Sequence, residues 1–121
     1  MAVKVVDASA LAAVLFNEPA AAAVAAQLGD AVLAAPTLIE YELGNTCWKK
    51  CRRQPAAAIA LRAALGAWRG LDLKLHDVDV LQTLQLAESR GLSFYDASYV
   101  WLAEHLRAPL ISLDRRLGEA R

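Results

Sequence analysis

"VVDASAL", residues 5–11, runs from two valines directly into an aspartate and then into alanine, serine and leucine. Valine favours strand, whereas alanine and leucine favour helix, so Asp7 stands where a short strand passes into a helix. Aspartate is also a preferred residue at a helix N-cap. The stretch therefore predicts a strand that ends on a carboxylate, and the chemistry of the chain depends on whether other carboxylates meet Asp7.

The rest of the chain alternates short apolar runs with helical segments. After a first strand at residues 2–6, further strands are expected at residues 31–35, 71–76 and 110–113. Helices are expected at residues 8–16, 19–28, 36–53, 55–68, 77–90 and 93–106, with a short final helix from Asp114. Asp77 and Ser93 are expected to cap two of these helices. Strands separated by helices predict a three-layer α/β/α fold with a parallel sheet, in a single domain of residues 1–121.

The composition narrows the class of protein without identifying a partner. Apolar residues make up 57% of the chain, which excludes a disordered protein. A formal net charge of 0 neither supports nor excludes a nucleic-acid partner. The longest apolar stretches are far too short to span a membrane, and Asp7 interrupts any signal-peptide core. Cys47 and Cys51 are expected to be reduced thiols of a cytoplasmic protein.

Three aspartates lie at positions where this fold would gather them. Asp7 and Asp114 follow the first and last expected strands, and Asp96 lies in the first turn of the last long helix. Each has a simpler explanation, since acids cap helices and stabilise their first turns. In parallel sheets, however, ligands bind beyond the carboxyl ends of the strands. The three aspartates are therefore candidate site residues.

The long central helix supplies a fourth candidate. It carries Glu40 and Glu42, which are two residues apart and therefore separated by about 200° around the helix axis, so only one of them can face an interior site. Glu42 shares its face with Asn45, Thr46 and Lys49. This polar stripe selects Glu42, and Glu40 is expected at the rim or surface.

Convergence of four carboxylates would require a counter-charge. At about 4 Å and an effective dielectric constant near 20, each pair of like charges repels by roughly 4 kcal/mol. Oxygen-only ligands select hard cations such as Mg²⁺ or Mn²⁺. An ion of this kind can activate a water molecule and hold phosphate oxygens, which suits phosphodiester hydrolysis. The 2′-hydroxyl need not react, so the expected products carry 5′-phosphate and 3′-hydroxyl ends.

Four segments resemble one known family, the PIN domains of VapC-type toxins. VVDAS (5–9) resembles its opening Asp-x-Ser/Thr motif, and PTLIEYELGN (36–45) its glutamate-bearing helix. LSFYDASYVWLA (92–103) resembles the segment Tyr-Asp-Ala-x-Tyr-x-x-Leu-Ala, and PLISLDRRL (109–117) the ending Thr/Ser-x-Asp. The four segments span almost the whole chain in the family's order. The resemblance implies a PIN-like fold.

The resemblance also implies an activity and partners. It implies a metal-dependent endoribonuclease with RNA as substrate, the toxin of a type II toxin–antitoxin pair, which a VapB-type antitoxin holds inactive. Such proteins are often dimeric, and the apolar composition with three tryptophans also favours a homodimer. The resemblance implies that Mg²⁺, or Mn²⁺, is held by four catalytic acids supported by three polar residues: Asp7, Glu42, Asp96 and Asp114, with Ser9, Asn45 and Ser112.

An acidic centre needs basic groups to guide RNA. Lys49 lies seven residues beyond Glu42, about 10 Å along the helix axis and nearly in line with it, and Arg115 follows Asp114. We expect Lys49 and Arg115 to bind substrate phosphates. The aromatic residues of the segment 94–101 can stack on bases, but core or dimer contacts are the simpler expectation.

Two alternatives fit parts of the pattern. A phosphoacceptor receiver domain has a parallel sheet with acids at its strand ends, but the chain lacks that design's acidic pair and its late Lys-Pro. A non-catalytic PIN-like binding module is the second alternative, although all four carboxylates are present. A phosphatase of the haloacid-dehalogenase type would need Asp-x-Asp, which Asp7 does not begin.

Overall fold

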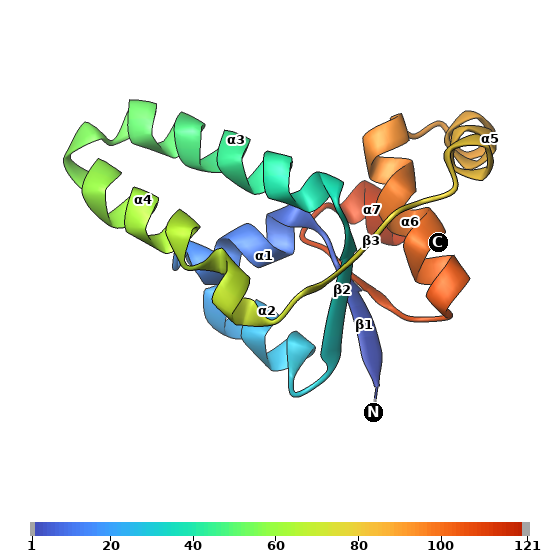
Figure 1. Cartoon of the computed structure of the whole chain (residues 1–121), viewed down its shortest axis with the longest axis horizontal. Helices are drawn as coiled ribbons and strands as arrows, with labels where there is room; N and C mark the ends of the chain where they lie inside the picture. The colour runs from blue at the N-terminus through green and yellow to red at the C-terminus, as the bar shows by residue number, and fades with distance from the viewer. Residues whose placement is uncertain (1, 120–121) are drawn as a thin grey trace.

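A four-stranded parallel sheet occupies the centre of the computed structural model, which describes residues 2–119 (Figure 1). Its strands are β1 (Val3–Val6), β2 (Val32–Pro36), β3 (Lys74–His76) and β4 (Leu110–Ile111), in the order β3-β2-β1-β4. All neighbouring strands pair in parallel, so their carboxyl ends share one edge of the sheet. The predicted parallel α/β architecture is confirmed.

Within residues 2–119, seven α-helices connect and cover the strands. They are α1 (Ala8–Leu15), α2 (Ala21–Leu28), α3 (Leu38–Arg53), α4 (Ala58–Gly66), α5 (Val80–Arg90), α6 (Phe94–Leu106) and α7 (Arg115–Glu119). Figure 1 shows α3 and α4 as a hairpin that projects from the sheet, with α5, α6 and α7 on the opposite side. Within residues 2–119, no helix has the length and apolarity that crossing a bilayer would require.

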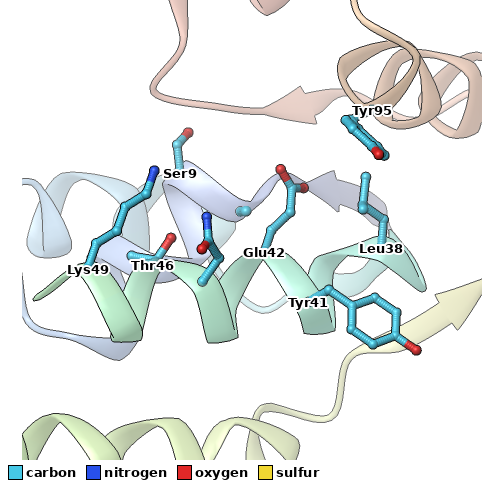
Figure 2. A pocket seen from close by; sticks show the side chains of 9 residues that line it. Ser9, Leu38, Tyr41, Glu42, Thr46, Lys49 and Tyr95 are labelled. Atoms are coloured by element: carbon cyan, nitrogen blue, oxygen red, sulfur yellow. The ribbon is translucent and has the colours of Figure 1, made fainter. Parts of the chain in front are cut away.

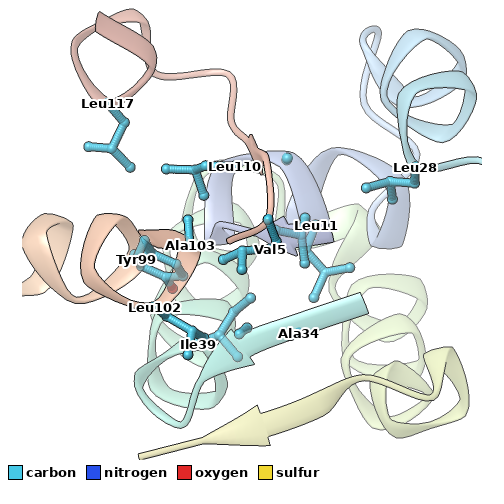
Figure 3. Packing of buried hydrophobic residues seen from close by; sticks show 14 of the residues in the cluster. Val5, Leu11, Leu28, Ala34, Ile39, Tyr99, Leu102, Ala103, Leu110 and Leu117 are labelled. Atoms are coloured by element: carbon cyan, nitrogen blue, oxygen red, sulfur yellow. The ribbon is translucent and has the colours of Figure 1, made fainter. Parts of the chain in front are cut away.

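The central strand β1 is covered on both faces. Val5 and Val6 are consecutive, so their side chains point to opposite faces of the sheet, and both are 0% exposed. Figure 3 shows Val5 and Ala34 of the sheet packed with Leu11 of α1 and Leu102 of α6. Burial on both faces confirms the three-layer arrangement, and it leaves Asp7 at the end of a strand that has no solvent-facing side.

The structure differs from the expected elements where local patterns were ambiguous. The strand expected at 71–76 begins only at Lys74, because Trp68–Leu71 forms a 3₁₀-helix (η2) and Asp72 adopts a left-handed φ of 53°. Similarly, η1 (Pro55–Ala57) precedes α4. The cap of α5 is Asp79 rather than Asp77, since the side chain of Asp79 accepts from the backbone N–H of Gln82.

Thr83 of α5 offers a test of the packing between α5 and α6. Among the described residues, its Oγ1 is a buried polar atom without a hydrogen-bond partner. A buried hydroxyl without a partner keeps its desolvation cost, which a methyl group of similar shape would remove. We expect Thr83→Val to raise the free energy of unfolding by about 1 kcal/mol, measured by urea denaturation. Thr37→Val, at an exposed position, is the control, and equal effects of the two substitutions would contradict this interpretation.

Candidate active site

Asp7 is a buried carboxylate held by neutral donors. It follows β1 and caps α1, with its Oδ1 accepting from the backbone N–H of Ala10 at 3.0 Å. Its side chain is only 4% exposed. Ser9 donates to Oδ1 at 2.7 Å and Ser112 donates to Oδ2 at 2.5 Å. Within residues 2–119 no ion pair of Asp7 is found, so hydroxyl and amide dipoles alone stabilise its charge.

The pKa of Asp7 shows how incomplete that stabilisation is. Burial raises the pKa of Asp7 above its usual range, and the negative charge of Asp114 raises it further. The hydrogen bonds from Ser112, Ala10 and Ser9 act in the opposite direction and offset only part of the rise. An ionised carboxylate here therefore costs free energy, which a nearby cation would offset.

Glu42 lies on α3 and is held by a tyrosine of α6. Tyr99 Oη donates to Glu42 Oε1 at 2.5 Å. Burial raises the pKa of Glu42, the Tyr99 hydrogen bond lowers it, and the charges of Asp96 and Asp7 raise it again. The pKa of Tyr99 is itself raised by burial and by Glu42, so the phenol stays protonated and remains a donor. Glu42 is thus fixed in position while it remains within the field of two other acids.

Asp96 and Asp114 complete the group from the other side. Ser93 caps α6 by accepting from the backbone N–H of Asp96 at 3.0 Å, which places Asp96 in the first turn. Asp114 donates its backbone N–H to Ser112 Oγ at 2.9 Å. Arg116 Nη2 lies 3.4 Å from Asp96 Oδ2 and 3.5 Å from Asp114 Oδ2. One guanidinium group therefore bridges two of the acids.

The four predicted acids form one electrostatic neighbourhood. The charge of Asp114 raises the pKa of Asp7, and the charges of Asp96 and Asp7 raise the pKa of Glu42. Arg116 contacts both Asp96 and Asp114. The donor set consists of carboxylate oxygens, two of them on acids of raised pKa, and therefore fits a hard divalent cation. Nevertheless, no three histidine, cysteine, aspartate or glutamate side chains of the described residues lie close enough to hold one ion.

The supporting residues divide into two groups. Ser9 and Ser112 contact Asp7, and Ser9 Oγ also accepts from the backbone N–H of Leu113 at 3.0 Å, which ties the end of β4 to Asp7. For Asn45, no hydrogen bond to a carboxylate is found in the described part of the chain, and its supporting role stays a prediction. Glu40 pairs with Arg69 at 2.9 Å instead of joining the acids.

Sequence reasoning did not identify two residues of the site. Tyr99 lies in the core, as expected, but its hydrogen bond to Glu42 is an additional role; it lies three residues after Asp96 and therefore on the same side of α6. Arg116 contacts two of the acids, and the phosphate contact predicted for its neighbour Arg115 stays a prediction. The spacing of Tyr99 was a usable signal, but nothing in two adjacent arginines indicates which one turns inward.

A pocket of about 680 Å³ opens beside Glu42. Ser9 and Leu38 lie on its wall together with Asn45 and Lys49, and Tyr95 lines it from α6. Figure 2 shows Lys49 and Tyr95 toward opposite ends of the pocket, with the carboxylate of Glu42 between them. The predicted phosphate contact Lys49 therefore lines the same pocket as Glu42, whereas Asp7, Asp96 and Asp114 are not among the lining residues.

Comparisons with known proteins identify the family and the fold of the chain. A family model described as PIN domain matches residues 4–121. The ribonuclease VapC3 of Pyrobaculum aerophilum is 32% identical over 120 residues, which cover 95% of this chain and 92% of the relative. The ribonuclease VapC9 of Mycobacterium tuberculosis is 36% identical over 116 residues, which cover 95% and 88%. A crystal structure of a P. aerophilum protein matches with a TM-score of 0.80 at 30% identity, over 98% of this chain and 84% of that one.

The contact between Tyr99 and Glu42 can be measured by a double-mutant cycle. Because the hydrogen bond joins a phenol to a carboxylate, Tyr99→Phe and Glu42→Ala should show a coupling free energy of about 1–3 kcal/mol in urea unfolding. The same cycle with Glu40→Ala should be additive within about 0.5 kcal/mol. Equal coupling in both cycles, or none in the first, would show that the hydrogen bond does not form in solution.

Proposed function

Because this chain belongs to the PIN domain family, we propose that it is a divalent-metal-dependent endoribonuclease that hydrolyses RNA phosphodiester bonds. The resemblance to VapC-type PIN domains in four segments of the sequence is confirmed by the family match and by the relatives. The observation that carries the proposal is the grouping of Asp7, Glu42, Asp96 and Asp114 at the carboxyl edge of the sheet.

The four acids would hold Mg²⁺, or Mn²⁺. When bound, such an ion lowers the pKa of a coordinated water and neutralises charge on a phosphate. The side chains of Asp96 and Asp114 are partly exposed and can rearrange toward an ion, whereas Asp7 is buried and held by two serines. Asp7 would therefore be the fixed anchor of the centre, and Asp96 and Asp114 would adjust around it.

The remaining side chains orient these acids or bind the substrate. Ser9 and Ser112 hold the oxygens of Asp7, and Tyr99 holds one oxygen of Glu42 so that the other stays available. Asn45 is proposed to support the ligands from α3. Lys49 and Arg115 are proposed to bind RNA phosphates on either side of the acids.

The partners follow from the family. The PIN family match decides against the receiver-like alternative, and the non-catalytic PIN-like module remains the rival that a cleavage assay tests. We propose a VapB-type antitoxin as the inhibitor, a cytoplasmic location, and a homodimer. A strict monomer at tens of micromolar by sedimentation would contradict the homodimer.

Metal binding should be visible without any cleavage assay. We expect Mg²⁺ or Mn²⁺ to raise the melting temperature, with each tenfold excess over Kd adding about 1.4 kcal/mol of stability. Asp7→Asn removes the anchor and should weaken this shift, whereas Glu40→Gln, on an acid outside the group, should keep it. Identical melting temperatures across millimolar metal in all three proteins would count against a metal site.

Substitutions of the two glutamates of α3 should have different effects on RNA cleavage. Glu42→Gln should reduce RNA cleavage by at least about 100-fold while the fold persists, because the substitution removes a charge from the acidic centre. Glu40→Gln should retain most activity, since Glu40 pairs with Arg69. Sequencing of the product ends should find 5′-phosphates. An essential Glu40 with a dispensable Glu42 would refute the assignment of the active face of α3.

A further inference from the structure

A guanidinium group of the protein itself contacts two of the proposed metal ligands. Arg116 Nη2 lies 3.4 Å from Asp96 Oδ2 and 3.5 Å from Asp114 Oδ2. By contrast, no ion pair of Asp7 or Glu42 is found within residues 2–119. The chain therefore neutralises two of its four acids, and these are the two that the proposed function expects to adjust around an ion.

The start of α7 keeps this guanidinium group close to both carboxylates. The backbone N–H of Arg116 donates to Asp114 Oδ1 at 2.9 Å, and the next residue, Leu117, is 1% exposed and packs in the core. Asp114 in turn donates its backbone N–H to Ser112 Oγ. The backbone of α7 thus fixes the position from which the side chain of Arg116 reaches Asp96 on α6 (Figure 1).

A guanidinium nitrogen and a divalent ion cannot share the same carboxylate oxygens. Mg²⁺ binds its ligand oxygens at about 2.0–2.1 Å, which is much closer than the 3.4 and 3.5 Å found at Arg116. Among the described residues, no three histidine, cysteine, aspartate or glutamate side chains lie close enough together to hold one ion. The two aspartates must therefore part from the guanidinium group before they can close on an ion.

The ion pairs of Arg116 are weak enough to be exchanged for a metal ion. The side chain of Arg116 is 72% exposed, and those of Asp96 and Asp114 are 26% and 35% exposed. Solvent screens ion pairs of this kind, so they contribute little stability. A divalent ion carries twice the charge, and it would also offset the charges of Asp7 and Glu42, whose pKa values are raised by burial. Arg116 can therefore compete with the ion without excluding it.

We propose that Arg116 is a built-in counter-ion, which pairs with Asp96 and Asp114 in the metal-free protein and is released when the divalent ion binds. This inference rests on the proposed metal centre and assigns to Arg116 the control of its metal affinity. Arg116 is a positioning residue in this role, because it acts through the two aspartates.

Calorimetric titration with Mg²⁺, in the absence of RNA, tests the proposal. Arg116→Ala should tighten Mg²⁺ binding by about 3- to 20-fold, because two exposed ion pairs no longer compete with the ion. Arg115→Ala is the matched control, since it removes the same charge from the adjacent position, for which no contact with the acids is found within residues 2–119. It should change the affinity by less than about twofold.

The release of the side chain can be followed in the parent protein by NMR. The Nε–H resonance of Arg116, identified by its absence from the spectrum of Arg116→Ala, should shift with Mg²⁺ and saturate at the calorimetric Kd. Equal Mg²⁺ affinity in Arg116→Ala and the parent, equal tightening in Arg115→Ala, or an Arg116 resonance that does not shift at saturation would each overturn this inference and leave the metal centre standing. If neither the parent nor Arg116→Ala binds Mg²⁺, the proposed metal centre fails first, and this inference fails with it.

Discussion

The burial of one carboxylate at the end of the central strand constrains the rest of the structure. Asp7 follows two fully buried valines and is itself almost entirely buried, so its oxygens rely on donors from the protein. Those donors come from the first turn of α1 and from Ser112 beyond β4. The strand order meets this need, because β4 lies next to β1 and Ser112 thereby reaches Asp7. The same group that begins a helix therefore also organises the candidate site.

The second organising element is α6. In one turn and a half it supplies Tyr95 to the pocket, Asp96 to the acidic group and Tyr99 to the carboxylate of Glu42. These side chains can have separate functions because Ser93 fixes the start of the helix and the buried residues of α6 fix its rotation. A helix that was rotated by one residue would bury the wrong tyrosine and turn Asp96 away from the site.

Local patterns were sufficient where a side chain's role is set by its own element. The strand-to-helix junction at Asp7 and the choice of Ser93 as a cap needed only residue preferences and spacing. The opposite placement of Glu40, which pairs with Arg69, needed only helical periodicity.

Local patterns failed where the role of a side chain depends on a partner that is distant in the sequence. Glu42 and Tyr99 are 57 positions apart in the sequence, so no local pattern reveals their hydrogen bond, and tertiary contacts place Arg116 rather than its neighbour beside Asp96. The start of β3 depends on a left-handed residue, Asp72, which no alternation of apolar residues reveals.

The hydrogen bond between Ser112 and Asp7, and the pairing of β4 with β1, determine when the site can form during synthesis. Ser112 and Asp7 are separated by 105 residues, so β4 can insert beside β1 only after residues 7–112 have been translated. A ribosome that has produced residues 1–109 has already made Asp7, Glu42 and Asp96, but neither the donor that Asp7 needs nor Asp114. The acidic group of a nascent chain is therefore incomplete until β4 has been made and has paired with β1. For a protein proposed to cut RNA, this order of events means that a nascent chain ending before Asp114 lacks one of the four proposed catalytic acids.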